Sequence, residues 1–411
     1  MNSYSKNSSN RKNINKSKKY FLDIKSTSTS SGHCKKQCPD VLYTEIGKTP
    51  SKRNGADMTK KQISSSINKK ILAYEKFPNW KKYAFISAIT LFFLTLYILF
   101  FGIQAFLQQL VNGIQLGSIY ALIALGYTMI YGIIRLINFA HGDLFMFGAY
   151  ISCFLGNYLM AHNFRYPFII VLIFSMAVTA LFGMAIEKIA YKPLRFKPRL
   201  AALITALGVS LFLENFFALS PQNVPFPLNK IVFGPKYIPF PALIAEKTYN
   251  IGGIFISNIK ILDVVITIIL MIALQYIVKK TMIGKAMRAV AFNKDACLMM
   301  GINIDKIISI TFGIGISLAA ASGTLFALTY GQLQSPYLGI WPGLKAFIAA
   351  VLGGIGNIPG AMLGSYLMGI SETFATSINS NFGYGIAFVI LIVVLIFKPA
   401  GLLGKFTKEK V

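Results

Sequence analysis

Three polar side chains that could bind a small polar molecule stand close together in the sequence, at Asn138, His141 and Asp143. Arg135 precedes them, and long apolar runs lie on both sides. An ionised side chain in the hydrocarbon core of a membrane costs about 2.5–3.5 kcal/mol, so these groups should face protein or water. We expect Asn138, His141 and Asp143 to shape a polar path or its gate. Alternatively, Asn138 caps the next helix, with His141 at its third position and Asp143 favouring its first turn.

Three glycines form a second feature, at Gly353, Gly354 and Gly356, and Asn357 and Pro359 follow them. Glycines in membrane helices more often allow close helix packing than contact a bound molecule. We nevertheless expect these three to line the same path, because Asn357 and Pro359 interrupt the helix at this point.

Four further charged residues, Glu214, Asp263, Lys345 and Glu372, lie near the ends of apolar runs. We expect most of them at the membrane interfaces, where a charge remains hydrated. A direct part in the path is the alternative.

Residues for covalent, metal or nucleotide chemistry are scarce. There is no G-x4-G-K-[ST] motif, because Leu42 stands where the first glycine would precede residues 47–49, and there is no H-E-x-x-H motif. His33, Cys34 and Cys38 could form half of a metal site, but the chain has only four cysteines and offers no second pair. We therefore expect no enzyme activity, no resident metal, no cofactor and no nucleotide site.

The elements that must position these residues are membrane-spanning helices. Hydrophobic residues make up 55% of the 411 residues and charged residues 13%, about half the usual share of charge in a soluble domain. Uncharged runs long enough to cross a bilayer as helices stand at 106–134, 166–186, 307–330 and 346–371. The sequence predicts an all-α, polytopic transmembrane bundle. It excludes a soluble enzyme, a disulfide-stabilised secreted protein and a disordered regulator.

The net charge of +27 is explained by membrane orientation rather than by binding to nucleic acid. Basic loops prefer the cytoplasmic side, so we expect 188–199, 279–306 and both termini to be cytoplasmic. The loop at 220–260, which contains six prolines, should lie on the opposite side.

This orientation predicts about eight or nine apolar spans, one of them broken or re-entrant. Segment 343–371 must return to the side from which it entered, and its glycine- and proline-rich centre favours two half-helices. The chain is expected to divide into a basic, disordered extension at 1–82, an additional span at 83–105 and a helical domain at 106–411.

The second basic stretch, at 279–306, has more helix signals than a simple connection between two spans needs. Residues 284–292 should form a short helix with Lys285 and Arg288 on its hydrated side. We interpret the stretch as a docking surface at the cytoplasmic face. The alternative is a plain link between two spans.

Capping residues divide the rest of this stretch into defined pieces. Asn293 is an expected N-cap for about two helical turns at 294–300, in which Asp295 suits the first turn. Gly301 should end them in the left-handed conformation, and Asn303 should cap the helix that enters the membrane at Ile307.

Residues 295–301, Asp-Ala-Cys-Leu-Met-Met-Gly, resemble the E-A-A-x-x-x-G element of ABC importer permeases. Asp replaces Glu and Cys replaces the second Ala. Three longer stretches are similar to the branched-chain amino acid ABC transporter permeases of the LivH type, and the resemblance covers 106–411. These stretches are FLQQLVNGIQLGSIYALIALGYTMIYGII at 106–134, INFAHGDLFMFGAY at 137–150 and AFIAAVLGGIGNIPGAMLGSYLMGISE at 346–372.

The resemblance implies a permease subunit in a bacterial plasma membrane that translocates branched-chain amino acids by alternating access. It implies cytoplasmic ABC ATPase subunits, a second permease subunit and an extracytoplasmic substrate-binding protein as partners. Lys285, Arg288, Asp295, Ala296 and Gly301 would then couple to the ATPases.

Two alternatives stay open. The same fold could import urea or short amides, because relatives with this pattern handle them too. A proton-coupled secondary transporter could use His141 and Asp143, but it would leave the docking surface without a purpose.

Overall fold

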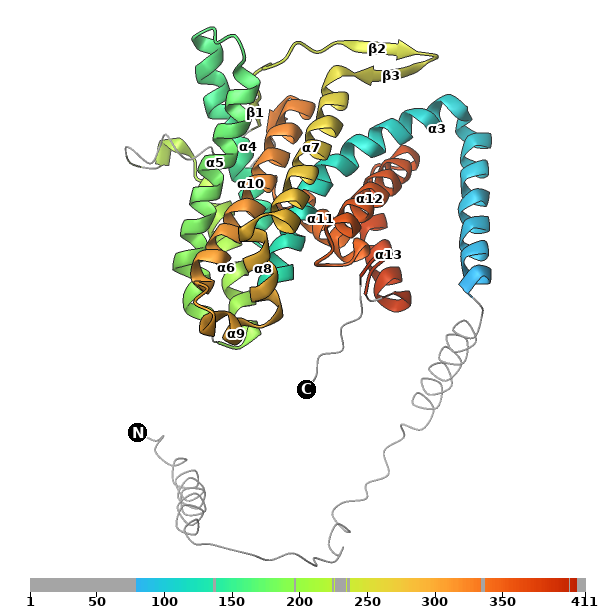
Figure 1. The fold of residues 1–411 in the computed structure, drawn as a ribbon. Coiled ribbons are helices and arrows are strands. Elements are labelled where there is room, and N and C mark those ends of the chain that lie inside the picture. The colour runs from blue at the N-terminus through green and yellow to red at the C-terminus, as the bar shows by residue number, and fades with distance from the viewer. Residues whose placement is uncertain are drawn as a thin grey trace, which may run out of the picture. The chain divides into compact units, whose positions relative to one another are not determined.

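The computed structural model describes residues 79–404 except 136–137, 196, 224, 226–233, 235–236, 334–336 and 399. The predicted extension at 1–82, with His33, Cys34 and Cys38, lies almost entirely outside the described residues, as does the tail from 405. The described part is predominantly α-helical, as predicted (Figure 1).

The first described helix, α3, runs from Asn79 to Ile134 and is interrupted at Gly102. Gly102 has a φ of +83°, a conformation that glycine adopts without the steric cost of a β-carbon. The two apolar runs predicted at 83–101 and 106–134 therefore lie on either side of this break, as two helical parts of α3. Whether 83–105 is a separate span stays a prediction.

Three more helices precede the first strands. They are α4 (His141–Ala161), α5 (Pro167–Ile186) and α6 (Arg199–Ala218), with short π and 3-10 turns η1 (Glu187–Tyr191), η2 (Lys192–Leu194) and η3 (Pro221–Asn223). The strands β1 (Ile238–Pro239), β2 (Thr248–Ile251) and β3 (Ile254–Ser257) follow.

The second half contains α7 (Asn258–Lys280), α8 (Met282–Phe292), α9 (Lys294–Met299), α10 (Ile304–Tyr330), β4 (Gln332–Leu333), α11 (Ile340–Gly353), α12 (Ile358–Ile378) and α13 (Phe382–Phe397).

Six helical segments in the described part are long and apolar enough to cross a membrane. They are Thr95–Ile134, His141–Ala161, Pro167–Leu194, Leu200–Ala218, Asn258–Lys280 and Ile304–Tyr330. The predicted count of eight or nine is not confirmed. One reason is that α11 has 14 residues and so measures about 21 Å, less than the roughly 30 Å of a hydrocarbon core.

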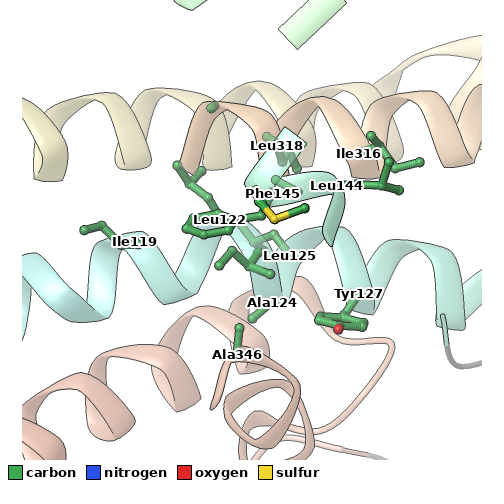
Figure 2. Packing of buried hydrophobic residues seen from close by; sticks show 14 of the residues in the cluster. Ile119, Leu122, Ala124, Leu125, Tyr127, Leu144, Phe145, Ile316, Leu318 and Ala346 are labelled. Atoms are coloured by element: carbon green, nitrogen blue, oxygen red, sulfur yellow. The ribbon is translucent and has the colours of Figure 1, made fainter. Parts of the chain in front are cut away.

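The second part of α3 lies at the centre of the apolar core (Figure 2). Its Leu122 and Leu125 are fully buried, together with Phe145 of α4 and Ala346 of α11. Helix α10 approaches α4 so closely that a β-carbon at Gly323 would overlap the backbone oxygen of Phe145. Because lipid tails are as apolar as leucine, such close backbone packing is a main source of helix association in membranes.

The broken segment predicted at 343–371 is confirmed as two helices, α11 and α12, separated at residues 354–357. Gly353 lies against the backbone of Gly360, and Gly364 lies against Ala349, so the two helices form an antiparallel hairpin. The hairpin is predicted to enter and leave the membrane on the same side, and this stays a prediction.

The loops gather at two opposite ends of the long helices. Lys192 and Arg195, in the first basic stretch, pair with Asp305 at the start of α10, so both basic stretches share one end. At the other end of α10, β4 pairs with β1, and Leu333 lies opposite Ile238. The described part of 220–260 therefore includes residues at the end away from the basic stretches.

Candidate functional site

The predicted caps around α8 and α9 are confirmed. The Asn293 side chain accepts a hydrogen bond from the Ala296 amide at 3.1 Å, and the Asn303 side chain accepts one from Lys306 at 3.0 Å. Gly301 has a φ of +74° and ends the α9 turns in the left-handed conformation. Sequence reasoning did not identify Thr281, which caps α8 by accepting a hydrogen bond from Gly284.

The exposed face of α9 is apolar at its end. Asp295 and Ala296 are exposed, whereas Cys297 is buried against the helices. Met299 and Met300 are 90% and 81% exposed. We call the exposed residues 295, 296 and 298–301 the α9 tip. Leu298, Met299 and Met300 together form a contiguous exposed apolar patch, a feature of surfaces that contact other proteins or lipid.

Helix α8 presents its cations on the hydrated side, as predicted. Lys285 and Arg288 are exposed, while Met287 and Val290 are buried. The Arg288 guanidinium donates a hydrogen bond to the carbonyl of Val278, near the end of α7. This hydrogen bond therefore connects α8 to the preceding membrane helix, α7.

Asn138 is 4% exposed and does not cap α4. That alternative role was wrong: α4 begins at His141, its N-cap residue is Ala140, and no side chain caps it. The Asn138 Oδ1 atom instead accepts a hydrogen bond from the Tyr191 hydroxyl at 2.7 Å. Because Tyr191 belongs to a π-helical turn, this contact depends on a local irregularity that the sequence did not indicate.

Asn138 also lines two narrow cavities of about 10 Å³ each, room for about one water molecule. Tyr191 and Phe312 line the first with it, and Tyr127 and Phe347 line the second. Its Nδ2 group has no hydrogen-bond partner among the described residues. A buried amide that lacks a partner is a group that a passing polar molecule could satisfy.

His141 is fully buried against α3. Its ring lies 4.5 Å from the ring of Tyr127, and a β-carbon at Gly126 would overlap its Nε2 atom. The Ile123 carbonyl is nearby, but neither ring nitrogen makes a well-aligned hydrogen bond to a described residue. The imidazole is thus enclosed by α3, and its position depends on the absence of a side chain at Gly126.

Asp143 faces a third element, α6. The Ser210 hydroxyl donates a hydrogen bond to Asp143 Oδ2, and the carboxyl groups of Asp143 and Glu214 also hydrogen-bond to each other. Two carboxyl groups can form such a contact when they share a proton. Asn138, His141 and Asp143 are therefore close in sequence but contact three different elements.

The three glycines that were predicted to line the path have different surroundings. Gly353 packs on α12, and Gly354, with a φ of +104°, packs on Ala400 and Gly404 near the end of the described chain. Gly356, with a φ of +93°, is exposed and has Gly132 of α3 as its near neighbour. Close packing accounts for Gly353 and Gly354, and the neighbouring Ile355 lines the second cavity.

Glu214, Asp263, Lys345 and Glu372 are all buried inside the protein, so their charges are not hydrated at the surface. Their depth in a membrane stays a prediction. Lys345 pairs with Glu372, which also accepts a hydrogen bond from the Tyr120 hydroxyl at 2.9 Å. The sequence separation within these pairs ranges from 27 to 252 residues, so no local signal identifies them.

Asp263 belongs to a second polar cluster. Its Oδ2 atom accepts hydrogen bonds from Gln115 at 3.0 Å and from Thr329 at 2.6 Å. These residues come from α3, α7 and α10, so the cluster joins three membrane helices.

Within the described part of the chain, no group of three or more His, Cys, Asp or Glu side chains could hold a metal ion.

Comparison with known proteins identifies relatives over most of the chain. A family model described as the permease component of branched-chain amino acid transport systems matches residues 109–395. A high-affinity branched-chain amino acid transport system permease, BraD of Pseudomonas aeruginosa, is 43% identical over 75% of this chain and 99% of its own length. LivH of Escherichia coli, described in the same words, is 38% identical over 74% of this chain and 98% of its own length.

A more distant relative, the ribose import permease RbsC of Escherichia coli, is 25% identical over 71% of this chain and 85% of its own length. No solved structure matches the chain.

Proposed function

Because the chain belongs to the permease family of branched-chain amino acid transport systems, we propose that it is the membrane-spanning subunit of an ATP-driven importer. It would carry branched-chain amino acids across a bacterial plasma membrane by alternating access. Its partners would be two cytoplasmic ABC ATPases, a second permease subunit and an extracytoplasmic binding protein.

The observation that carries this proposal is the exposed α9 tip. Met299 and Met300 are flexible apolar side chains that are largely exposed, and the Asn293 and Asn303 caps hold the backbone that presents them. A surface that is both apolar and rigid suits insertion into a cleft of another protein. We propose that the ATPase subunits provide this cleft, with Lys285, Arg288, Asp295, Ala296 and Gly301 at the contact.

The path for the solute is proposed to pass Asn138, which lines two neighbouring cavities. In this conformation each cavity is too narrow for an amino acid, so the path would have to widen between α3, η1 and α11. His141, Asp143 and the glycines Gly353, Gly354 and Gly356 would set the positions of these elements.

The substrate class rests on the two relatives that are 43% and 38% identical and named for branched-chain amino acids. Urea and short amides are the competing substrates, and competition by each of them in the same uptake assay distinguishes these possibilities.

The test is ATP-dependent uptake of labelled leucine by vesicles that contain this chain and its candidate partners. Gly301→Asp should abolish uptake and prevent co-purification of the ATPases, because it places a charge and a strained backbone at the α9 tip. Gly331→Asp is the matched control, since Gly331 also ends a helix with positive φ and open space around it, at the far end of α10.

Both substitutions should cost about 1–2 kcal/mol in backbone strain, but only Gly301→Asp should remove uptake. Unchanged uptake by Gly301→Asp, driven by a proton gradient without ATP, would overturn the proposal.

One observation favours the proton-coupled alternative, namely the contact between the carboxyl groups of Asp143 and Glu214. If this pair carries the proton, Asp143→Asn should abolish proton-driven uptake. Under the importer proposal, the same variant should leave uptake dependent on ATP and insensitive to an uncoupler.

A further inference from the structure

A cavity of about 290 Å³ opens at the end of the spans that carries the basic stretches. It lies between the end of α3, the segment after η2, the start of α6 and the junction of α8 with α9. This volume is about thirty times that of either narrow cavity at Asn138, so it has room for a group of phosphate size.

Four cations line the cavity: Arg135, Arg195, Lys197 and Lys294. None of the described residues that line it is acidic. Two carboxylates outside the lining, those of Glu187 and Asp305, pair with Arg195, and Asp305 also pairs with Lys192 at 2.8 Å. The lining therefore presents positive charge from three separate parts of the chain.

The electrostatic effect of this arrangement is visible at Lys294. Burial, followed by the charges of Arg195 and Arg135, lowers the pKa of its ammonium group, and Asp295 opposes this shift. Like charges that approach one another in a partly buried site repel, and a bound anion removes that repulsion.

The remaining walls of the cavity are apolar. They include Ile134, Ala202 and Val290, and Phe292 at the rim is 92% exposed. Two candidate membrane spans end beside the cavity, at Ile134 and Leu194. In a membrane crossed by these two spans, the cavity would lie near the headgroups, and it combines basic groups with apolar walls.

We propose that this cavity binds the phosphate group of an anionic phospholipid, with the apolar walls against its glycerol and acyl parts. A free phosphate ion would use the four cations but would gain nothing from Ile134, Ala202, Val290 or Phe292. Basic pockets between helices at a membrane face bind lipid headgroups by this chemistry.

The experiment uses the purified full chain in a neutral detergent and follows its thermal unfolding. The probes are dioctanoyl phosphatidylglycerol, dioctanoyl phosphatidylcholine and inorganic phosphate. We expect a saturable rise in Tm with phosphatidylglycerol alone. The double variant Lys197→Gln with Lys294→Gln should weaken this binding, by about fivefold for each charge removed.

The control is a second double variant, Lys188→Gln with Lys306→Gln, in which both substitutions lie outside the cavity. Both lysines are exposed and neither lines the cavity, so the net charge changes equally. This control should retain the affinity of the natural chain for phosphatidylglycerol. Equal affinities in all three proteins, or equal effects of phosphatidylcholine, would overturn the proposal. An equal effect of inorganic phosphate would assign the cavity to a free anion and overturn the lipid assignment.

A second measurement covers the case in which the double variant does not fold. Phosphatidylglycerol binding by the natural chain should weaken as sodium chloride rises, because the contact is between charges. Binding that is independent of salt would contradict the proposal. Loss of ATPase co-purification in the double variant, with unchanged lipid binding, would assign the cavity to an acidic partner segment instead.

Discussion

At the scale of single residues, one buried pair of opposite charges is balanced across helices. Lys345 of α11 pairs with Glu372 of α12, Tyr120 of α3 donates to the same carboxylate, and the Lys345 ammonium lies 4.5 Å from the ring centre of Tyr384 in α13. Four helices meet at this cluster. Removing one partner from a buried pair leaves an uncompensated charge, which is more harmful than removing both.

Glu372→Gln should therefore destabilise the protein by about 3–5 kcal/mol, because Lys345 remains buried without a counter-charge. The double variant Lys345→Met with Glu372→Gln should recover part of this loss. Thermal unfolding of the single and double variants in detergent measures the coupling. Additive effects of the two substitutions would show that the pair is not coupled.

Asn138 is the residue at which a direct role in uptake is tested by substitution. Asn138→Leu removes the unpartnered Nδ2 group together with the Oδ1 atom that accepts from Tyr191, and we expect leucine uptake to fall by about tenfold, the effect of about 1.4 kcal/mol. ATPase co-purification should not change. Thr179→Val is the control, since it also replaces a buried polar group that has no hydrogen-bond partner among the described residues. Equal losses in both variants would argue against a path at Asn138.

At the scale of elements, sequence reasoning succeeded where structure depends on neighbouring residues. Asn293, Gly301 and Asn303 act within a few residues of their own positions, and their roles were predicted correctly. Asn138 looked like a cap by the same rule, but its partner Tyr191 is 53 residues away. Asp263 was named from the sequence, but its buried contacts were not predicted for the same reason, because its partner Gln115 is 148 residues away.

The α11–α12 hairpin gives a prediction at this scale. A β-carbon at Gly353 would overlap the backbone of Gly360, so Gly353→Ala should destabilise the hairpin by about 1–3 kcal/mol. Gly385→Ala in α13 is the control, because its β-carbon would meet nothing within 4 Å. It should be neutral or slightly stabilising, since alanine favours helices over glycine. Tm values of the purified proteins test the difference, and equal values would contradict the close packing.

At the scale of the whole described chain, the loops form two chemically different ends. The end with Lys192, Arg195 and Asp305 is rich in charge, and the other end carries the β2–β3 hairpin and the β1–β4 pair. The composition predicted a membrane protein, because long uncharged runs suffice for that. The number of spans stays a prediction, because α11 and α13, with 14 and 16 residues, are shorter than a typical membrane-spanning helix.

A labelling experiment tests the orientation. A cysteine at Asn250, in the β2–β3 hairpin, should react with an impermeant maleimide in intact cells. A cysteine at Lys306 should react only after permeabilisation. Cys34, Cys38, Cys153 and Cys297 are replaced by serine first, so the introduced thiol is the sole target. The reverse pattern would invert the proposed topology.

Helix α10 begins three residues after Gly301 and ends beside β4, and it is continuous over its 27 residues. Its length is therefore about 40 Å. A helix of this kind behaves as a lever, and a tilt of about 5° at the α9 end would displace the other end by about 3.5 Å. Because β4 pairs with β1, that displacement would reach the loop around Ile238 on the far side. A movement at the α9 end would then be transmitted along the continuous helix α10 to the loops at its other end.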